Sequence, residues 1–118
     1  MRLKVQNRTR DLSLADHADI ADTSSKRRTG LLKHSQLAPG DGLWIVPCEA
    51  VHTFMMKFPI DVLFLDKKRK ILKVRSKMSR SKLAICLRAH SVLELPSGTC
   101  ESTGTVRGDQ LELEKFEN

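Results

Sequence analysis

The chain has 118 residues, of which 40% are hydrophobic, enough for the core of one compact domain but not of two. Its 21 Lys and Arg residues outnumber its 14 Asp and Glu residues, which gives a formal net charge of +7. Ten of the basic residues lie between Lys67 and Arg88, where no acidic residue occurs, so the rest of the chain sums to −3 (11 − 14). This uneven distribution excludes a uniformly basic, histone-like chain, and the apolar content excludes wholesale disorder. We predict a single domain over residues 1–118.

The sequence contains no candidate for a membrane span or an export signal. No apolar run approaches the roughly 20 residues that cross a bilayer, and residues 1–19 lack the apolar core of a secretory signal. We therefore expect a cytoplasmic protein that does not associate with a membrane.

The cysteines and histidines do not form the patterns of a metal site. Cys48, Cys86 and Cys100 are odd in number and form no CxxC motif, so we expect reduced, separate thiols rather than a disulfide framework. The four histidines show none of the short spacings that preform a metal site. We predict neither a metal nor a cofactor.

The first third of the chain predicts two strands and a short helix. Residues 3–5 and 12–14 alternate between apolar and polar side chains on either side of a polar turn, which is typical of two half-buried strands. The segment 22–24 supplies several possible helix N-caps, so we expect one helix near residues 23–34.

The middle of the chain contains the strongest strand. Residues 60–66 are apolar on both faces, which predicts a central strand, and the basic turn 67–69 joins it to the alternating segment 71–75 in a hairpin. Lys and Arg along one face of the second strand favour a sheet edge, where they discourage pairing with other chains. Short apolar runs at 43–46 and 51–56 predict two further strands.

The last third predicts two more strands on either side of a polar segment. Residues 89–95 read as a strand that ends at Pro96, and residues 110–114 alternate. The segment 97–104 fits a single helical turn or an irregular loop. With about seven short strands and one helix, we predict an α+β, mostly β domain folded as a compact barrel-like roll.

Several motifs along the chain resemble those of one known family. In chain order they are Arg27-x-x-Gly30-Leu31-Leu32, Gly40-Asp41-Gly42-Leu43, Pro47-Cys48, the block from His52 to Asp66, the block from Val92 to Thr99, and Gly108-Asp109. These motifs are similar to those of domain of unknown function family 192 (DUF192), and the resemblance covers nearly the whole chain. It implies a small, β-rich prokaryotic protein whose biochemical activity is not established.

Two acidic residues in apolar runs indicate a binding pocket. Asp61 opens the most apolar strand and Glu94 lies within the run 92–95, where an ionised carboxylate is costly unless it is paired. The structural interpretation predicts that Asp61 is buried and hydrogen-bonded to backbone N–H groups or to His52, Thr53 or Lys57. The functional interpretation is a noncatalytic small-ligand binding module with a pocket around residues 52–61. Its candidate ligand-binding residues are His52, Thr53, Met56, Lys57, Asp61 and Glu94, within apolar walls that include Trp44 and Phe54.

The basic cluster from Lys67 to Arg88 supports a second hypothesis, a weak and nonspecific nucleic-acid binder. Its candidate polyanion-binding residues are Lys67, Lys68, Arg69 and Lys70. The five aromatic residues lie outside the cluster, so stacking on bases is not indicated. A solvated sheet edge is the simpler interpretation of the same charges.

An enzyme of unassigned reaction is the third hypothesis, because a pocket with a histidine, a lysine and two carboxylates contains the groups for acid–base chemistry. Cys48 and His52 have the chemistry of a nucleophile and a base, but four residues of extended chain span about 13 Å. No nearby Asp or Asn obviously orients the imidazole either. We therefore predict no catalytic residue, and the ligand-binding module remains the main hypothesis.

Overall fold

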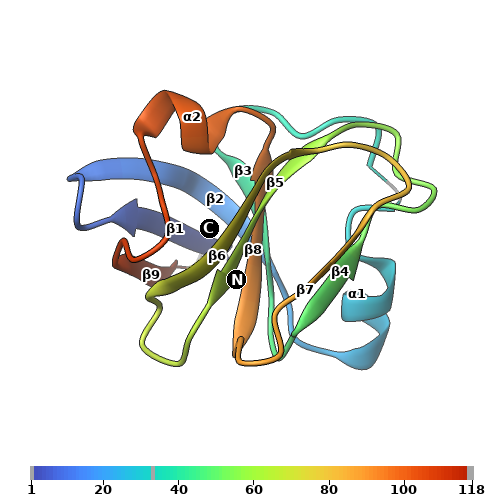
Figure 1. Cartoon of the computed structure of the whole chain (residues 1–118), viewed down its shortest axis with the longest axis horizontal. Helices are drawn as coiled ribbons and strands as arrows, with labels where there is room; N and C mark the ends of the chain where they lie inside the picture. The colour runs from blue at the N-terminus through green and yellow to red at the C-terminus, as the bar shows by residue number, and fades with distance from the viewer. Residues whose placement is uncertain (1, 33, 117–118) are drawn as a thin grey trace.

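The structure, a computed structural model, describes residues 2–32 and 34–116 (Figure 1). Nine strands and two short helices follow one another along these residues. The strands are β1 (Arg2–Asn7), β2 (Leu12–Ala21), β3 (Asp41–Ile45), β4 (Ala50–His52), β5 (Ile60–Leu65), β6 (Ile71–Met78), β7 (Leu83–Ile85), β8 (Ser91–Pro96) and β9 (Leu111–Phe116), and the helices are α1 (Ser24–Thr29) and α2 (Thr99–Thr103). In this part of the chain, no helix is long and apolar enough to span a membrane.

Seven strands form one mixed sheet in the order β6-β5-β8-β3-β2-β1-β9, and β4 pairs with β7 in a separate two-stranded ribbon. β2 and β3 run parallel, whereas the other paired strands run antiparallel. Every residue of β5 is buried, and β5 lies between β6 and β8, so the predicted internal strand is confirmed. The predicted hairpin and the edge position of β6 are confirmed as well.

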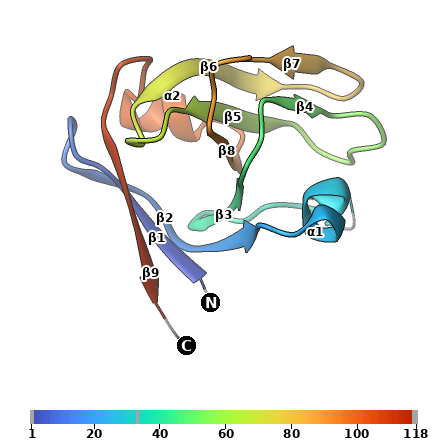
Figure 2. The same ribbon diagram turned by 90° about the horizontal axis from the view of Figure 1, so that it is seen from below.

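The sheet is strongly curved, but it is not closed into a barrel, so the predicted barrel is wrong. In Figure 2, β5, β6 and β8 lie on one side of the molecule and β1, β2 and β9 on the other. The edge strands meet at one isolated bridge between Lys70 and Gln110. The antiparallel register there places β6 opposite the loop before β9, and β9 opposite the turn before β6. Within the described residues the two edges therefore cannot form a continuous ladder.

The count of about seven strands and one helix is also corrected, to nine and two in the described residues. No predicted segment corresponds to β7, which has three residues, whereas the helical turn that was one alternative for residues 97–104 is present as α2, with five residues. The strand predicted over residues 71–75 is three residues longer in the structure, where β6 ends at Met78. A three-residue strand carries too little alternation to be recognised, so the pairing of β7 with β4 depends on tertiary packing.

The central strands are covered on both faces, which gives the protein two apolar cores. The inner core lies within the curve of the sheet and includes Leu63 and Leu93. The outer core lies on the opposite face, towards α1 and the β4–β7 ribbon, and includes Val62 and Val92. Successive side chains of a strand point to opposite faces, so β5 and β8 supply both cores in alternation. A polar side chain on either strand is consequently buried.

Asp61, fully buried in β5, is satisfied by three backbone donors. Its carboxylate accepts hydrogen bonds from the N–H groups of Lys77 (2.8 Å), Gly98 (3.2 Å) and Cys100 (2.8 Å). Gly98 has φ 93°, a left-handed conformation that glycine adopts readily. One carboxylate therefore ties the end of β6 and the start of α2 to β5, and the predicted burial and hydrogen bonding of Asp61 are confirmed.

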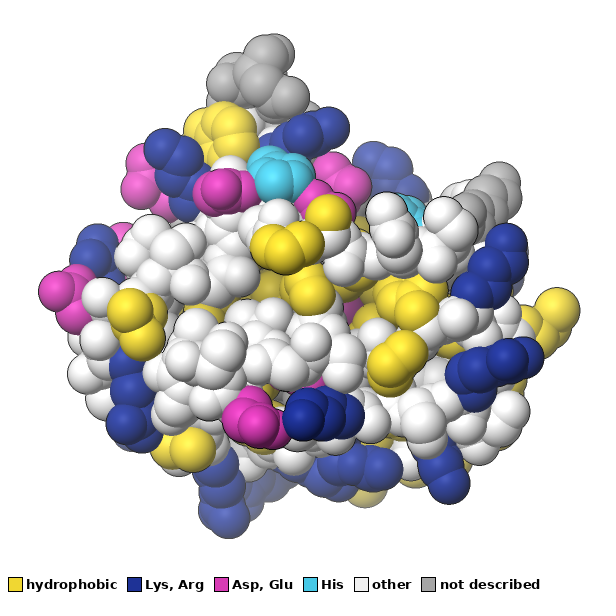
Figure 3. All heavy atoms as spheres, turned by 90° about the horizontal axis from the view of Figure 1, so that it is seen from above, with side chains coloured by type: hydrophobic (Ala, Val, Ile, Leu, Met, Phe, Trp, Pro, Cys, Tyr) yellow, Lys and Arg dark blue, Asp and Glu magenta, His cyan; other side chains and the backbone are white. Residues whose placement is uncertain are grey.

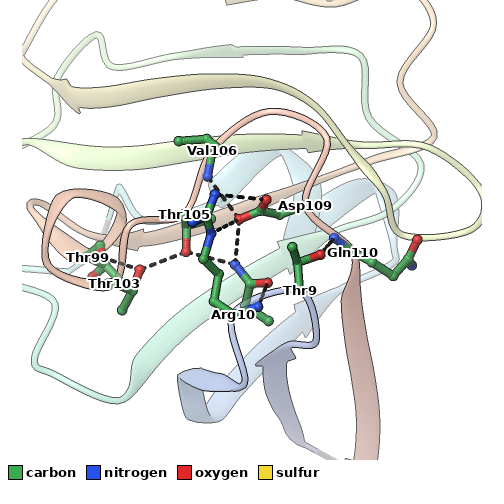
Figure 4. A network of polar contacts seen from close by, with 9 residues as sticks. Thr9, Arg10, Thr99, Thr103, Thr105, Val106, Asp109 and Gln110 are labelled. Carbon is green, nitrogen blue, oxygen red and sulfur yellow. Dashed lines mark hydrogen bonds and ion pairs between the residues drawn. The ribbon is translucent and has the colours of Figure 1, made fainter.

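A second polar network holds the loop before β9 against the β1–β2 turn (Figure 4). The Asp109 carboxylate accepts hydrogen bonds from Arg10 Nε (2.9 Å), Asn7 Nδ2 (3.0 Å) and the Val106 N–H (3.2 Å). Burial alone would raise the pKa of Asp109, but these donors together lower it. The ionised carboxylate is therefore stabilised, and the network orients the chain as it enters the last strand.

We expect Asp61→Ala to lower the free energy of unfolding by about 1 to 3 kcal/mol, because it leaves three backbone donors without their acceptor. Urea unfolding at neutral pH measures the change. Asp19→Ala is the control, since Asp19 is exposed in a surface ion pair with Arg2 (3.6 Å) and should change stability by less than about 0.5 kcal/mol. An unchanged urea midpoint for Asp61→Ala would contradict the structural role of this carboxylate.

Candidate functional site

A hollow of about 280 Å³ opens on the outer face of the sheet, where α1, the segment 45–52 and β8 meet. Its apolar lining includes Leu31, Val51 and Met56. The polar residues that line it are Arg27, Arg28, Thr29, Cys48, His52 and Glu94. We call this cavity the Glu94 hollow, because Glu94 is its most deeply buried charged residue.

Glu94 is a buried carboxyl group that has no partner among the described residues. It lies in β8, is 5% exposed, and is flanked in the neighbouring strands by Leu43 and Val62. Among the described residues, no side chain or backbone group forms a hydrogen bond or an ion pair with its carboxylate. Burial raises the pKa of Glu94 to about 7. Near neutral pH the group therefore exists both as the acid and as the carboxylate.

Three of the six predicted ligand-binding residues line the Glu94 hollow, namely His52, Met56 and Glu94. His52 ends β4, and its ring stacks on Phe54 with 5.2 Å between the ring centroids. Met56 is buried in the loop that follows β4. The hollow thus combines an imidazole, a thioether and a carboxyl group in one small cavity.

The other three predicted residues lie outside this hollow. The Thr53 hydroxyl donates to the Ser79 carbonyl (2.5 Å) and accepts from the Lys82 N–H (2.8 Å), so it holds the loop before β7. The Asp61 carboxylate is occupied by its backbone donors. Lys57 is exposed between β4 and β5. These three residues are not brought together with Glu94.

Cys48 lies in the wall of the Glu94 hollow as a neutral thiol. Its Sγ donates a hydrogen bond to the Ala50 carbonyl (3.2 Å). Burial raises the pKa of Cys48, the charge of Glu94 raises it further, and the charge of Arg27 lowers it. Because the thiolate is the reactive form of cysteine, the raised pKa disfavours a nucleophilic role. All three cysteines are unpaired, as expected.

The basic cluster 67–88 extends over the β5–β6 turn, β6 and β7. In Figure 3, Lys and Arg side chains gather along the lower edge of the picture. This edge is the side of the molecule that faces the viewer in Figure 1. Of the ten basic side chains, Lys77 alone has an acidic partner among the described residues, Glu101 at 2.7 Å. The cluster therefore presents almost all of its charge without neutralisation.

The four candidate polyanion-binding residues differ in their surroundings. Lys67, Lys68 and Lys70 are exposed. The Arg69 guanidinium lies over the Trp44 ring, 4.8 Å from its centroid. Trp44 belongs to the inner core, so it does not line the pocket in which the sequence placed it. Arg69 is committed to this packing, whereas the three lysines are accessible to solvent.

A second hollow, of about 470 Å³, lies beside the first and shares Pro47 and Cys48 with it. Its basic lining residues are Lys67, Arg88 and His90, which approach one another although they are separated in the sequence. Burial lowers the pKa of His90, and the charges of Arg69 and Lys67 lower it further. The imidazole is therefore held neutral beside the basic cluster.

Within residues 2–32 and 34–116, no three His, Cys, Asp or Glu side chains converge as a set of metal ligands. His17 contacts two carboxylates, those of Asp16 and Asp41, one at each ring nitrogen. This half-exposed group joins β2 to the start of β3 and is occupied by its own ion pairs.

Comparison with known proteins places the chain in a family. The family model of DUF192, described as Uncharacterized ACR, matches residues 5–113. The chain belongs to the DUF192 family. No curated protein matches it in sequence.

Two solved structures share the fold of this DUF192 protein. One is a protein of unknown function from Novosphingobium aromaticivorans, with 18% identity, a TM-score of 0.81, and coverage of 95% of this chain and 84% of the other. The second, from Sinorhizobium meliloti, is described as a "putative transcription regulator", with 23% identity, a TM-score of 0.82, and coverage of 95% and 92%. At these identities the likeness concerns the fold alone.

Sequence reasoning missed the part of the Glu94 hollow that α1 and Cys48 supply. Arg27 and Cys48 both belong to the motifs that resemble DUF192, so the resemblance marked them. It did not indicate that they lie beside Glu94, which is far away in the sequence. No local pattern reports such a contact, because the fold of the outer core creates it.

We expect Glu94→Met to stabilise the protein, because an apolar side chain of similar length replaces a buried carboxyl group without a partner. The difference in unfolding free energy between Glu94→Met and the wild-type protein should increase with pH. The folded-state pKa of Glu94, about 7, lies above its ordinary value of 4.5. The wild-type protein should therefore lose up to about 3 kcal/mol of stability as the pH rises from 4.5 through 7.

Urea unfolding at pH 5 and pH 8 measures both effects. Glu94→Gln is the matched control, since it keeps the shape of the side chain, cannot titrate, and should remove this part of the pH dependence. A Glu94→Met variant that is less stable than the wild-type protein at pH 8 would show that the carboxylate has a stabilising partner.

Proposed function

We propose that this DUF192 protein is a noncatalytic binding module for a small ligand, which occupies the Glu94 hollow. One observation carries the proposal: a carboxyl group buried among apolar side chains lines an open cavity and has no hydrogen-bond or ion-pair partner among the described residues. A buried polar group without a partner costs a fold about 1 to 3 kcal/mol. A ligand that donates a hydrogen bond or a positive charge to Glu94 would offset this cost.

The size and lining of the hollow support a small ligand. Its volume of about 280 Å³ lies just below the roughly 300 to 1,000 Å³ typical of drug-sized ligands. Binding pockets commonly combine apolar walls with a few polar groups that orient the ligand. Leu31, Val51 and Met56 supply such walls, and Glu94, His52 and Arg27 supply such groups.

A library of small amines, acids, alcohols and amides, screened by two-dimensional amide NMR, tests the proposal. We expect hits to shift the signals of residues 45–52 and 92–96, which form or adjoin the hollow. A hit should also raise the unfolding free energy by about 2.7 kcal/mol at a concentration of 100 Kd.

The same hits are then measured on two variants. Glu94→Met, which is expected to fold more stably, should weaken or abolish binding, whereas Glu112→Gln removes an exposed acidic charge on β9 and should leave binding unchanged. Hits that bind Glu94→Met as tightly as the wild-type protein would place the ligand elsewhere. A library without any member that shifts the hollow signals would also contradict the proposal.

Weak, nonspecific binding of nucleic acid is the second candidate function, and a specific observation favours it. Nine of the ten basic side chains between Lys67 and Arg88 lack an acidic partner among the described residues. Unneutralised Lys and Arg bind phosphates with little sequence preference, because phosphate contacts position a protein but do not read bases.

We expect wild-type affinity for a labelled DNA or RNA oligonucleotide to fall steeply between about 50 and 200 mM salt, because each neutralised phosphate releases a counterion. Fluorescence anisotropy measures the slope. Changing Lys67, Lys68 and Lys70 to Ser should flatten it, while Arg69 is retained because it packs on Trp44. The matched control changes the exposed Lys4, Lys26 and Lys115 to Ser and should have a smaller effect. Absence of binding at low salt would eliminate this candidate.

A further inference from the structure

Charges of opposite sign line the Glu94 hollow at different depths. Glu94 on β8 is its acidic lining residue and is buried. Arg27 and Arg28 on α1 are its cationic lining residues, the first half-buried and the second exposed. The Cys48 thiol lies within electrostatic reach of both Glu94 and Arg27. A negative inner end and a positive outer end therefore belong to one small cavity.

The inner end favours an ammonium group. An ion pair between a carboxylate and an ammonium group is strong in apolar surroundings, because the effective dielectric constant is lower than in water. A neutral hydroxyl would supply one hydrogen bond without the Coulombic gain, and an anion would be repelled. Of these three groups, a protonated amine compensates the buried charge best.

The outer end favours an anion. The Arg27 guanidinium donates to the Asp22 carbonyl (3.3 Å) and to Ser24 Oγ (3.5 Å), both of which are long hydrogen bonds near the start of α1. A guanidinium has five N–H donors in a planar fork, so three remain for the oxygens of a ligand. These contacts also hold Arg27 towards its own helix, so that it does not neutralise Glu94 in the structure.

We infer that the ligand of the Glu94 hollow is a small zwitterion, with its ammonium group at Glu94, its anionic group at Arg27, and a short apolar segment between them. This inference rests on the proposed function and adds the chemical class of the ligand. The apolar side chains of Leu31, Val51 and Met56 line the same cavity and suit an alkyl segment. Two ion pairs of opposite direction would orient the ligand, and a molecule that carries one charge would bind more weakly because it forms one pair at most.

Four probes with the same five-carbon chain test the inference: 5-aminopentanoate, pentylamine, pentanoate and pentanol. Amide NMR titrations at pH 8 and low salt give the dissociation constants. We expect 5-aminopentanoate to bind most tightly, pentylamine to bind about five- to tenfold more weakly, and the other two to bind weakest of all. The difference between the first two probes measures the contribution of the anionic end.

Two variants of α1 isolate the outer end. Arg27→Met should lower the affinity for 5-aminopentanoate to that for pentylamine, and it should leave the affinity for pentylamine unchanged. Lys26→Met is the matched control: it removes the same charge from the same helix, but Lys26 is exposed and lines a different hollow. It should leave the affinities for both probes unchanged.

Glu94→Gln and a pH series isolate the inner end. Glu94→Gln should lower the affinity for both amines by about tenfold or more, because the ammonium group then loses its charged partner. For the wild-type protein, both amines should bind more tightly as the pH rises from 5.5 to 8, since Glu94 loses its proton over that range. The series is repeated with His52→Gln so that the imidazole at the hollow cannot account for the trend.

The outcomes separate this inference from the proposed function. If pentanoate or pentanol shifts the hollow signals more strongly than the amines do, the ligand is not a zwitterion of this kind, yet the hollow still binds a ligand. Amine binding that survives Glu94→Gln unchanged would overturn the position of the ammonium group. If all four probes leave the hollow signals unchanged, the inference fails, and the proposed function fails with it only when the wider library also has no hit.

Discussion

Strands β5 and β8 are covered on both faces, and this constraint determines what each polar side chain on them can do. Apolar neighbours surround both strands, so a carboxyl group there must find donors in the protein or remain without them. Asp61 finds three backbone N–H groups and thereby anchors the end of β6 and the start of α2. Glu94 faces the outer core, where α1 and the segment 45–52 leave a cavity instead of donors.

The contrast between these two carboxyl groups connects the fold to the candidate site. Stability alone would favour an apolar side chain at position 94, since burial raises the pKa of Glu94 to about 7 and no described residue forms a compensating bond with it. Residues that lower stability and make no stabilising contact often belong to functional sites. The neutral Cys48 thiol in the same wall is poorly suited to nucleophilic chemistry. These two residues are the reason that we propose a binding role for the cavity.

The basic cluster has a structural explanation in the open sheet. The backbone hydrogen bonds between the two edges lie around the bridge of Lys70 and Gln110, at the first residues of β6 and β9. In the described part of the chain, the rest of β6 therefore has no strand on its outer side. Lys and Arg along such an edge keep it solvated and oppose pairing with another chain. Arg69 has a further role, since it covers the Trp44 ring of the inner core. Solvation of the sheet edge and packing on Trp44 thus explain much of the positive charge without a nucleic-acid partner.

Local sequence patterns determined the strands other than β7, the β5–β6 hairpin, the edge position of β6 and the burial of Asp61. Each of these depends on alternation, turn composition or one charge in an apolar run, which are properties of neighbouring residues. Tertiary structure alone decided that the curved sheet stays open, that β7 pairs with β4, and that Trp44 faces the inner core while Glu94 faces the outer one. It also decided that Arg27, Cys48 and Glu94 share a cavity, whereas Thr53, Lys57 and Asp61 lie outside it. The physical reason is that a strand pattern shows which residues are buried, but only the packing of distant elements shows which groups they are buried against.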